Sequence, residues 1–269
     1  MISGGDLTVD GQRNSAIKNT DVFSPAHNTL TDNTPMNYPR WYGSLVSLPN
    51  GHLAIFGGRQ NQGLLSPAQP AMTPEIYDPV TTTWTSLAGA TSAAAFGGLD
   101  TYDWYYPKSY VAPGGNIFVL SNDGTMYAVS TAGNGTTTRY AVTAPTGYPW
   151  LPTIPFAPVP VVTQTDKIDQ ARWFASGAIM ADGRVLITGG AQGFNELIGV
   201  AYQAQIWDPA TGHWTAGATA SKPRLYHSSS LLRINASYLF PVVSQRYSNR
   251  FIWLRDSMVS RSAADCASS

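Results

Sequence analysis

Apolar and polar positions along the chain follow a repeated pattern. Three segments align without gaps, at residues 40–51, 104–115 and 172–183, and each runs from an aromatic pair through a mostly apolar stretch to a glycine-containing turn. A second apolar run follows each turn. Pro-Asn-Gly and Ala-Asp-Gly between apolar runs favour hairpins, because Asn, Asp and Gly tolerate the backbone conformations that tight turns need. Each segment is therefore expected to form a β-hairpin.

A second pattern follows two of these hairpins. Residues 75–84 and 205–214 each contain a short aromatic-rich strand, an Asp-Pro turn and a Trp eight residues after the Ile, and residues 21–25 are a weaker copy. Two hairpins make a four-stranded unit, and a repeated four-stranded unit is typical of a β-propeller blade. The pattern therefore predicts an all-β fold built of such blades.

Double glycines end the second apolar runs at Gly57-Gly58 and Gly189-Gly190, and the chain opens on another, Gly4-Gly5. A double glycine after a hydrophobic strand, followed by an aromatic turn with Pro and by a Trp, resembles the kelch repeat. The resemblance implies an incomplete kelch-type β-propeller, in which residues 1–232 supply roughly four of an expected seven blades.

Composition excludes several classes of partner. Only 12% of the 269 residues are charged, and 16 basic residues balance 16 acidic ones. No long-range field would therefore attract nucleic acid or an anionic membrane surface. No stretch stays apolar over the roughly 18 residues that a membrane helix needs. We expect neither nucleic acid nor a membrane as a partner.

Two short runs point to a particular chemistry. Pro-Arg-Leu-Tyr-His-Ser at 223–228 and Pro-Arg-Trp-Tyr at 39–42 resemble the copper radical oxidases, the family of galactose oxidase and glyoxal oxidase. Members oxidise a primary alcohol or aldehyde and reduce O₂ to hydrogen peroxide. The resemblance implies copper as cofactor, with O₂ and a small alcohol, aldehyde or carbohydrate as partners. Imidazole and phenolate ligands suit Cu(II).

The resemblance assigns three site residues. Tyr42 matches the radical tyrosine that is cross-linked to a Cys, Tyr226 matches the axial tyrosine that acts as a base, and His227 matches a histidine ligand. Tyr42 and Tyr226 are thus candidate catalytic residues, and all three are candidate copper ligands. Aligned on the aromatic pair, Tyr42, Tyr106, Phe174 and Tyr226 occupy one position, named here the lead aromatic.

Parts of the family's pattern have no match in this chain. The cross-linking Cys would precede Met1, whereas the single Cys is Cys266, in no matching context. Nothing after His227 matches the second histidine ligand, and Arg59-Gln60 stands where galactose oxidase has a Trp that stacks on the radical. We therefore expect this chain alone to be inactive.

The segment 233–269 continues without a double glycine or the blade pattern. We expect it to be a non-cognate, irregular tail that arises from a frameshift, a retained intron or a misannotated gene end, with Met1 an internal methionine. The low charge is typical of secreted β proteins. The full-length protein is accordingly expected to be extracellular, with a signal peptide that this chain lacks.

A different class of function stays open. The chain could be a noncatalytic kelch propeller that binds a protein or a carbohydrate, because a fold does not determine a function. A glycan-degrading propeller is disfavoured, because it needs acidic residues that converge on the axis. Glu75 and Glu196 are the only glutamates, and most aspartates stand in predicted turns.

Overall fold

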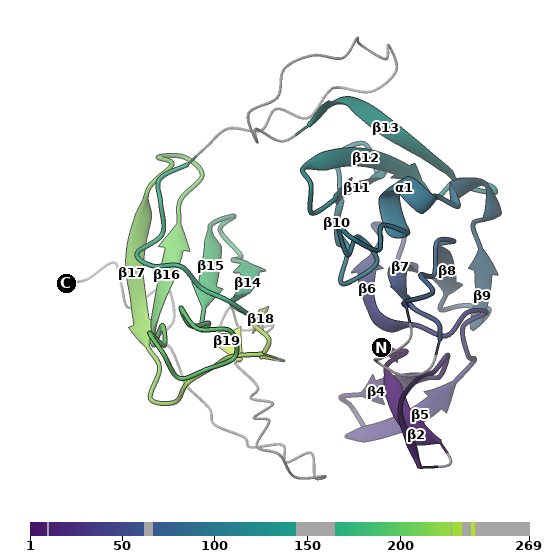
Figure 1. The fold of residues 1–269 in the computed structure, drawn as a ribbon, viewed down its shortest axis with the longest axis horizontal. Coiled ribbons are helices and arrows are strands. Elements are labelled where there is room, and N and C mark those ends of the chain that lie inside the picture. The colour runs from purple at the N-terminus through teal and green to yellow at the C-terminus, as the bar shows by residue number, and fades with distance from the viewer. Residues whose placement is uncertain (10, 62–66, 144–164, 227, 233–237, 240–269) are drawn as a thin grey trace. The chain divides into compact units, whose positions relative to one another are not determined.

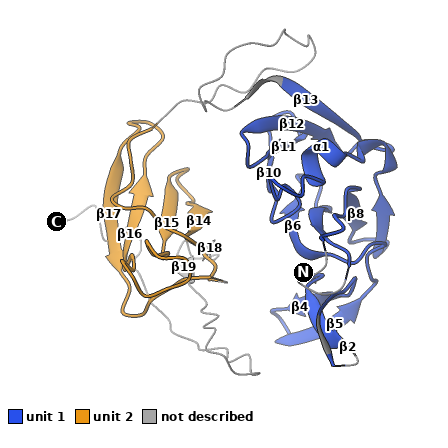
Figure 2. Cartoon of the chain, in the orientation of Figure 1, with its two compact units in different colours: residues 1–162 blue, residues 163–269 orange. Residues whose placement is uncertain are grey.

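The computed structural model describes residues 1–269 except 10, 62–66, 144–164, 227, 233–237 and 240–269 (Figure 1). The chain divides into two compact units, residues 1–162 and 163–269 (Figure 2). Apart from a 3-10 turn at Ala88–Ala90 and the short helix α1 at Ala93–Phe96, the described elements are β-strands. The predicted all-β class is confirmed.

Unit 1 contains two four-stranded antiparallel sheets. One has the order β6 (Trp41–Ser47), β7 (Leu53–Arg59), β8 (Glu75–Asp78), β9 (Thr83–Ser86); the other has the order β10 (Lys108–Val111), β11 (Ile117–Leu120), β12 (Thr125–Ser130), β13 (Thr136–Thr143). Two smaller sheets precede them: β1 (Ile2–Ser3), β4 (Thr20–Ser24) and β5 (Thr29–Asn33), then β2 (Asp6–Val9) with β3 (Gln12–Ala16).

Unit 2 contains a third four-stranded sheet. Its order is β14 (Ser176–Ile179), β15 (Val185–Thr188), β16 (Gln203–Trp207), β17 (Trp214–Thr219). A short pair follows, β18 (Leu231–Leu232) with β19 (Tyr238–Leu239). Strand β19 falls inside the segment 233–269, for which the sequence predicts an irregular tail. The other residues of that segment lie outside the described part of the chain, so the boundary at 232 stays a prediction.

The three predicted hairpins are confirmed, and their turns share the same hydrogen bond. In each turn the N–H of the glycine donates to the carbonyl oxygen three residues earlier, at 3.0 Å for Gly51, 2.9 Å for Gly115 and 3.0 Å for Gly183. Their φ angles are 85°, 83° and 86°, a left-handed conformation that glycine adopts without a Cβ penalty. The sequence repeat is therefore a repeat of local structure.

The successive sheets form an incomplete β-propeller-like fold, as the sequence predicts. The weaker copy at 21–25 forms the β4–β5 hairpin, and β1 pairs with β4 as β7 pairs with β8. That first blade is therefore three-stranded where the pattern predicts four. The hairpin β2–β3 is an insertion that the sequence pattern does not predict. This insertion lies between Gly5 and Ile17, and the N–H of Ile17 donates to the carbonyl oxygen of Gly5 at 3.1 Å.

Apolar residues on the facing sides of the first two four-stranded sheets form the main core. Phe56 of β7 and Phe96 of α1 are fully buried, with ring centroids 5.8 Å apart. Ile117 and Val119 on β11 and Val129 on β12 belong to the same cluster. Alternate residues of β11 and β12 thus point into the core, as the two-residue period of a strand requires. In unit 2 a smaller cluster contains Leu186 and Ala204.

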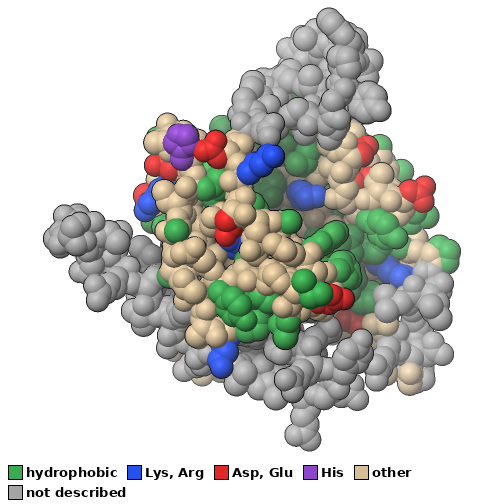
Figure 3. Space-filling view, turned by 60° about the vertical axis from the view of Figure 1, so that its left-hand side comes forward, with side chains coloured by type: hydrophobic (Ala, Val, Ile, Leu, Met, Phe, Trp, Pro, Cys, Tyr) green, Lys and Arg blue, Asp and Glu red, His purple; other side chains and the backbone are tan. Residues whose placement is uncertain are grey.

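The surface carries scattered charge. On the face seen in Figure 3, Lys and Arg side chains lie among polar and hydrophobic ones rather than in one continuous patch. Large hydrophobic side chains are exposed in both units, among them Tyr102 in unit 1 and Phe194 in unit 2. In the described ranges, no helix combines the length and hydropathy needed to cross a bilayer.

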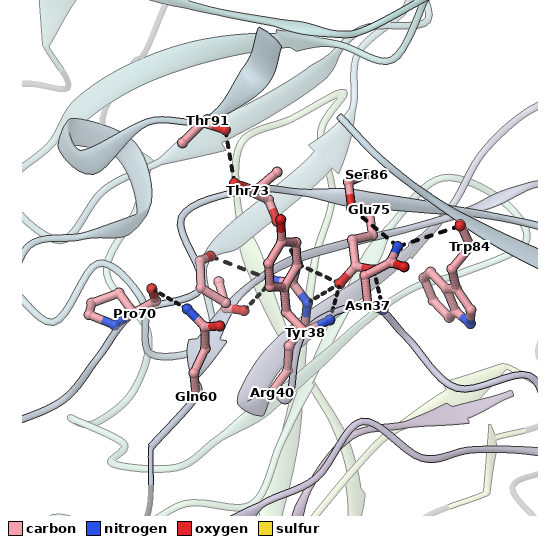
Figure 4. Close-up of polar contacts among 12 residues, drawn as sticks. Asn37, Tyr38, Arg40, Gln60, Pro70, Thr73, Glu75, Trp84, Ser86 and Thr91 are labelled. Carbon is pink, nitrogen blue, oxygen red and sulfur yellow. Dashed lines mark hydrogen bonds and ion pairs between the residues drawn. The ribbon is translucent and has the colours of Figure 1, made fainter. Parts of the chain in front are cut away.

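A buried ion pair holds the first four-stranded sheet together (Figure 4). Arg40 donates to Glu75 Oε1 from Nε at 3.1 Å and from a terminal nitrogen at 2.9 Å, and neither side chain is exposed. The guanidinium also donates to the carbonyl oxygens of Gly57 and Thr73. Glu75 Oε2 accepts the backbone N–H of Asn37 at 2.7 Å. Burial lowers the pKa of Arg40, and the charge of Glu75 opposes that shift.

The four-stranded sheet of unit 2 has an equivalent arginine, Arg172, but its carboxylate partner comes from a different position in the sequence. Arg172 donates to the carbonyls of Gly189 and Gln203, the counterparts of the carbonyls that Arg40 binds. Gln205 replaces Glu75, and Asp169 supplies the carboxylate, 2.8 Å from the guanidinium. Gln205 still accepts the N–H of Asp169, at 3.0 Å. The negative charge has therefore moved from a strand to the residue three places before the arginine.

The difference between the two sheets predicts the effect of removing the carboxylate in unit 1. Glu75→Gln leaves Arg40 buried without a counter-charge, and we expect it to lower the free energy of unfolding by about 3 kcal/mol. Adding Asn37→Asp places a carboxylate at the position of Asp169, so the double variant Asn37→Asp/Glu75→Gln is expected to recover part of the loss. Urea denaturation of the three proteins measures both effects. Equal stability of the single and double variants would contradict the charge relocation.

Candidate functional site

The lead aromatics have an unusual backbone conformation. The φ angles of Tyr42, Tyr106 and Phe174 are 69°, 45° and 58°, in the left-handed region that side chains with a Cβ rarely adopt. Such strain often marks a functional site. In this chain it recurs at Phe174, whose side chain has no ligand atom, so it belongs to the architecture of the blade rather than to metal binding.

The double glycines position the lead aromatic of the following blade. Gly58 N–H donates to the carbonyl oxygen of Trp104 at 2.7 Å, and the same bond joins Gly5 to Arg40 at 2.8 Å and Gly190 to Arg224 at 2.7 Å. The acceptor stands two residues before the lead aromatic each time. The backbones approach so closely that a Cβ on Gly57 would lie 2.7 Å from the carbonyl oxygen of Trp104, and one on Gly189 would lie 2.6 Å from that of Arg224. The glycines are therefore required for blade-to-blade packing.

Tyr42 lies half-buried among aromatic rings from its own blade and the next one. The Trp41 ring stacks on it at 4.4 Å between centroids with an interplanar angle of 22°. Tyr105 and Tyr106 contact it at 4.5 and 5.3 Å. The N–H of Tyr106 also donates to the Tyr42 carbonyl oxygen at 2.9 Å. Tyr42 is thus enclosed by three rings.

Sequence reasoning missed the stacked tryptophan. The residues after the double glycine, Arg59-Gln60, predict no Trp over Tyr42, and Arg59 is instead buried with Nε bonded to Asn61 at 2.7 Å. The residue before Tyr42 supplies the stacking ring. Neighbours along a strand normally point to opposite faces, but the left-handed φ of Tyr42 breaks that alternation. The adjacent aromatic residues Trp41 and Tyr42 were the signal in the sequence that could have revealed this stack.

Tyr226 occupies the place in unit 2 that Tyr106 occupies in unit 1. It is half-buried, and its ring lies 4.7 Å from that of Phe174, the preceding lead aromatic. This contact repeats the one between Tyr42 and Tyr106. His227 lies outside the described residues, so its placement beside Tyr226 stays a prediction.

The described residues around Tyr42 do not by themselves fit a copper ion. They offer phenol groups and an indole, whereas Cu(II) favours imidazole together with oxygen ligands. Across the part of the chain that the structure describes, no three His, Cys, Asp or Glu side chains gather into a metal site. The missing imidazole in the predicted donor set is that of His227. The side chains around Tyr42 therefore supply phenol chemistry but not a complete set of copper ligands.

Comparison with known proteins supports the fold. No protein-family model matches the sequence, and no curated protein matches it either. Among solved structures, a fungal alcohol oxidase of the AA5 family, in complex with copper, matches 90% of this chain with a TM-score of 0.67 and 22% sequence identity. The match spans 58% of the length of that oxidase. At this identity the likeness establishes the fold and leaves the activity as a proposal.

Partial burial of Tyr106 makes a measurable prediction: 45% of the residue is exposed, and packing against the rings of Tyr42 and Tyr105 shields the rest from water. Burial, and next the neighbouring Tyr105, raise the pKa of Tyr106 from 10.0 to about 12. The folded state favours the neutral phenol, so this contribution to stability is complete below pH 10 and disappears as the pH rises towards 12. Ultraviolet titration of tyrosinate should show a late component that Tyr106→Phe removes. Tyr110→Phe, at an exposed tyrosine on β10, should leave that component in place; its loss there instead would contradict the assignment.

Proposed function

We propose that this chain is part of a copper radical oxidase-like, kelch-type propeller, with Tyr42, Tyr226 and His227 as copper ligands. The observation that carries the proposal is the structural match to a copper-bound AA5 alcohol oxidase over 90% of the chain. The motifs at 39–42 and 223–228 support it, because both occur at the lead aromatic of a blade.

Each residue has a distinct role in this proposal. Tyr42 is the radical tyrosine, and its stacked rings suit a residue that must hold an unpaired electron away from water. Tyr226 is the base towards the substrate hydroxyl, and His227 supplies imidazole. Copper, when bound, would supply one of the two electron changes of an alcohol oxidation and the tyrosine the other. The substrates are O₂ with a small primary alcohol, an aldehyde or a carbohydrate, and the full-length protein is secreted.

This chain alone is proposed to be incompetent as an oxidase. Its single cysteine, Cys266, has no matching context, and the family's second histidine has no match after His227. Two phenols and one imidazole would hold copper weakly and could not support the cross-linked radical. A weak copper site without peroxide production is therefore the expected behaviour of the purified chain.

Copper affinity tests these assignments. Titration of the purified chain with Cu(II), followed by electron paramagnetic resonance, should reveal a weak site that depends on the motif at 223–228. His227→Ala and Tyr226→Phe should each weaken binding by roughly tenfold or more, as expected for loss of a ligand. His213→Ala, which removes an exposed histidine outside the motif, is the matched control. Unchanged affinity in His227→Ala would refute the assignment, and peroxide production by the copper-loaded chain would refute its incompetence.

The second candidate function is a noncatalytic kelch propeller that binds a protein or a carbohydrate. The left-handed conformation of the lead aromatic favours this alternative, because Phe174 has the same geometry with no ligand atom. The genomic reading frame distinguishes the two functions. A radical oxidase requires a Cys codon in frame shortly before Gly4-Gly5, whereas a binding propeller does not. Sequencing the locus and finding uninterrupted blade sequence without that Cys would favour the binding function.

A further inference from the structure

Tyr42 belongs to a connected group of six oxidisable side chains, named here the aromatic cluster. Its members are Trp41, Tyr42, Tyr102, Trp104, Tyr105 and Tyr106. From Tyr42 the ring centroids lie 4.5 Å to Tyr105, then 5.7 Å from Tyr105 to Trp104, and 6.1 Å from Trp104 to Tyr102. A second branch joins Tyr42 to Tyr106 at 5.3 Å.

The cluster extends from the protein interior to the surface. Trp41 and Trp104 are only 8% and 6% exposed, whereas Tyr106 is 45% and Tyr102 is 58% exposed. Both branches from Tyr42 therefore end at a tyrosine that is partly exposed to water.

Packing alone does not explain this choice of residues. Unit 2 has the same blade-to-blade contact with different side chains at the aligned positions. The counterparts of Tyr42, Trp104 and Tyr105 there are Phe174, Arg224 and Leu225. Phe174 still contacts the next lead aromatic, Tyr226, at 4.7 Å. The blade geometry therefore accepts side chains that resist oxidation, and unit 1 replaces them with phenols and an indole around the candidate radical residue.

Tyr and Trp are the aromatic side chains that lose one electron most readily, and rings this close exchange electrons easily. We propose that the aromatic cluster is a relay that carries single oxidising equivalents between Tyr42 and the exposed phenols of Tyr102 and Tyr106. The relay rests on the proposed role of Tyr42 as the radical residue. It would let a one-electron oxidant load that residue without entering the site.

The transfer balances in electrons and protons. An outer-sphere one-electron oxidant removes an electron from the Tyr106 phenol, which releases its proton to water and becomes a phenoxyl radical. An electron then passes from Tyr42 to Tyr106: Tyr106 takes up a proton again, and Tyr42 releases one. The oxidant is reduced by one electron, and one proton appears in solution. In the branch through Tyr102, Trp104 and Tyr105 pass the electron in successive steps of the same kind.

Oxidation of the copper-free chain tests the relay. The chain is treated with hexachloroiridate(IV), a one-electron outer-sphere oxidant, and tyrosine oxidation products are mapped by peptide mass spectrometry. Wild type should carry products at Tyr42 as well as at Tyr102 and Tyr106. In Tyr105→Phe/Tyr106→Phe, which keeps the rings and interrupts both branches, products at Tyr42 should fall roughly tenfold or more, while those at Tyr102 persist.

Two controls keep the result interpretable. Tyr110→Phe removes an exposed phenol outside the cluster and should leave oxidation of Tyr42 unchanged. Thermal denaturation shows whether the double variant is folded, and Tyr106→Phe alone, which should lower Tyr42 oxidation less, serves if it is not. Equal oxidation of Tyr42 in wild type and the interrupted variants, or none in wild type, overturns the relay. Because no copper is used, this outcome is separate from failure of the copper site.

Discussion

The buried pair between Arg40 and Glu75 is the constraint on which the first complete blade depends. A guanidinium is costly to remove from water unless its donors are satisfied, and here a carboxylate and two carbonyls satisfy them. Those partners stand on β7, on β8 and just before β8, so one side chain ties the start of β6 to the next two strands. The carbonyl of Arg40 accepts the N–H of Gly5 from the preceding sheet. Arg40 therefore holds the strands of its own blade together through its side chain and links that blade to the preceding one through its carbonyl oxygen.

The backbone conformation of the lead aromatic does not depend on the chemistry of its side chain. The positive φ of Tyr42 follows from the way the chain turns into β6 just after Arg40, and Phe174 shows the same conformation after Arg172. The scaffold thus presents an aromatic ring at this point in successive blades, and a phenol hydroxyl there is an addition to an existing position. A ligand site can be acquired at such a position without any change in backbone.

Local features were the predictable ones. The hairpins around Gly51, Gly115 and Gly183 could be predicted from sequence because turn chemistry acts over a few residues. The pairing of Arg40 with Glu75 could not, because the partners are far apart along the chain and neither type indicates burial. The hairpin β2–β3 interrupts the repeat, and the Trp41 stack depends on a backbone angle that no pattern reveals. Motifs pointed to Tyr42, Tyr226 and His227, and the ligand roles of all three stay predictions.

The relocation of the acid between blades has a consequence for recombination. Two blades carry one carboxylate for their arginine, contributed by Glu75 of β8 in the β6–β9 blade and by Asp169, ahead of β14, in the β14–β17 blade. A genetic crossover between the arginine and the third strand would give two hybrid blades. One would hold both Glu75 and Asp169 beside a single arginine, and the reciprocal one would hold an arginine with no carboxylate. Blades can therefore be exchanged or duplicated as whole modules, whereas hybrid blades inherit an unbalanced core.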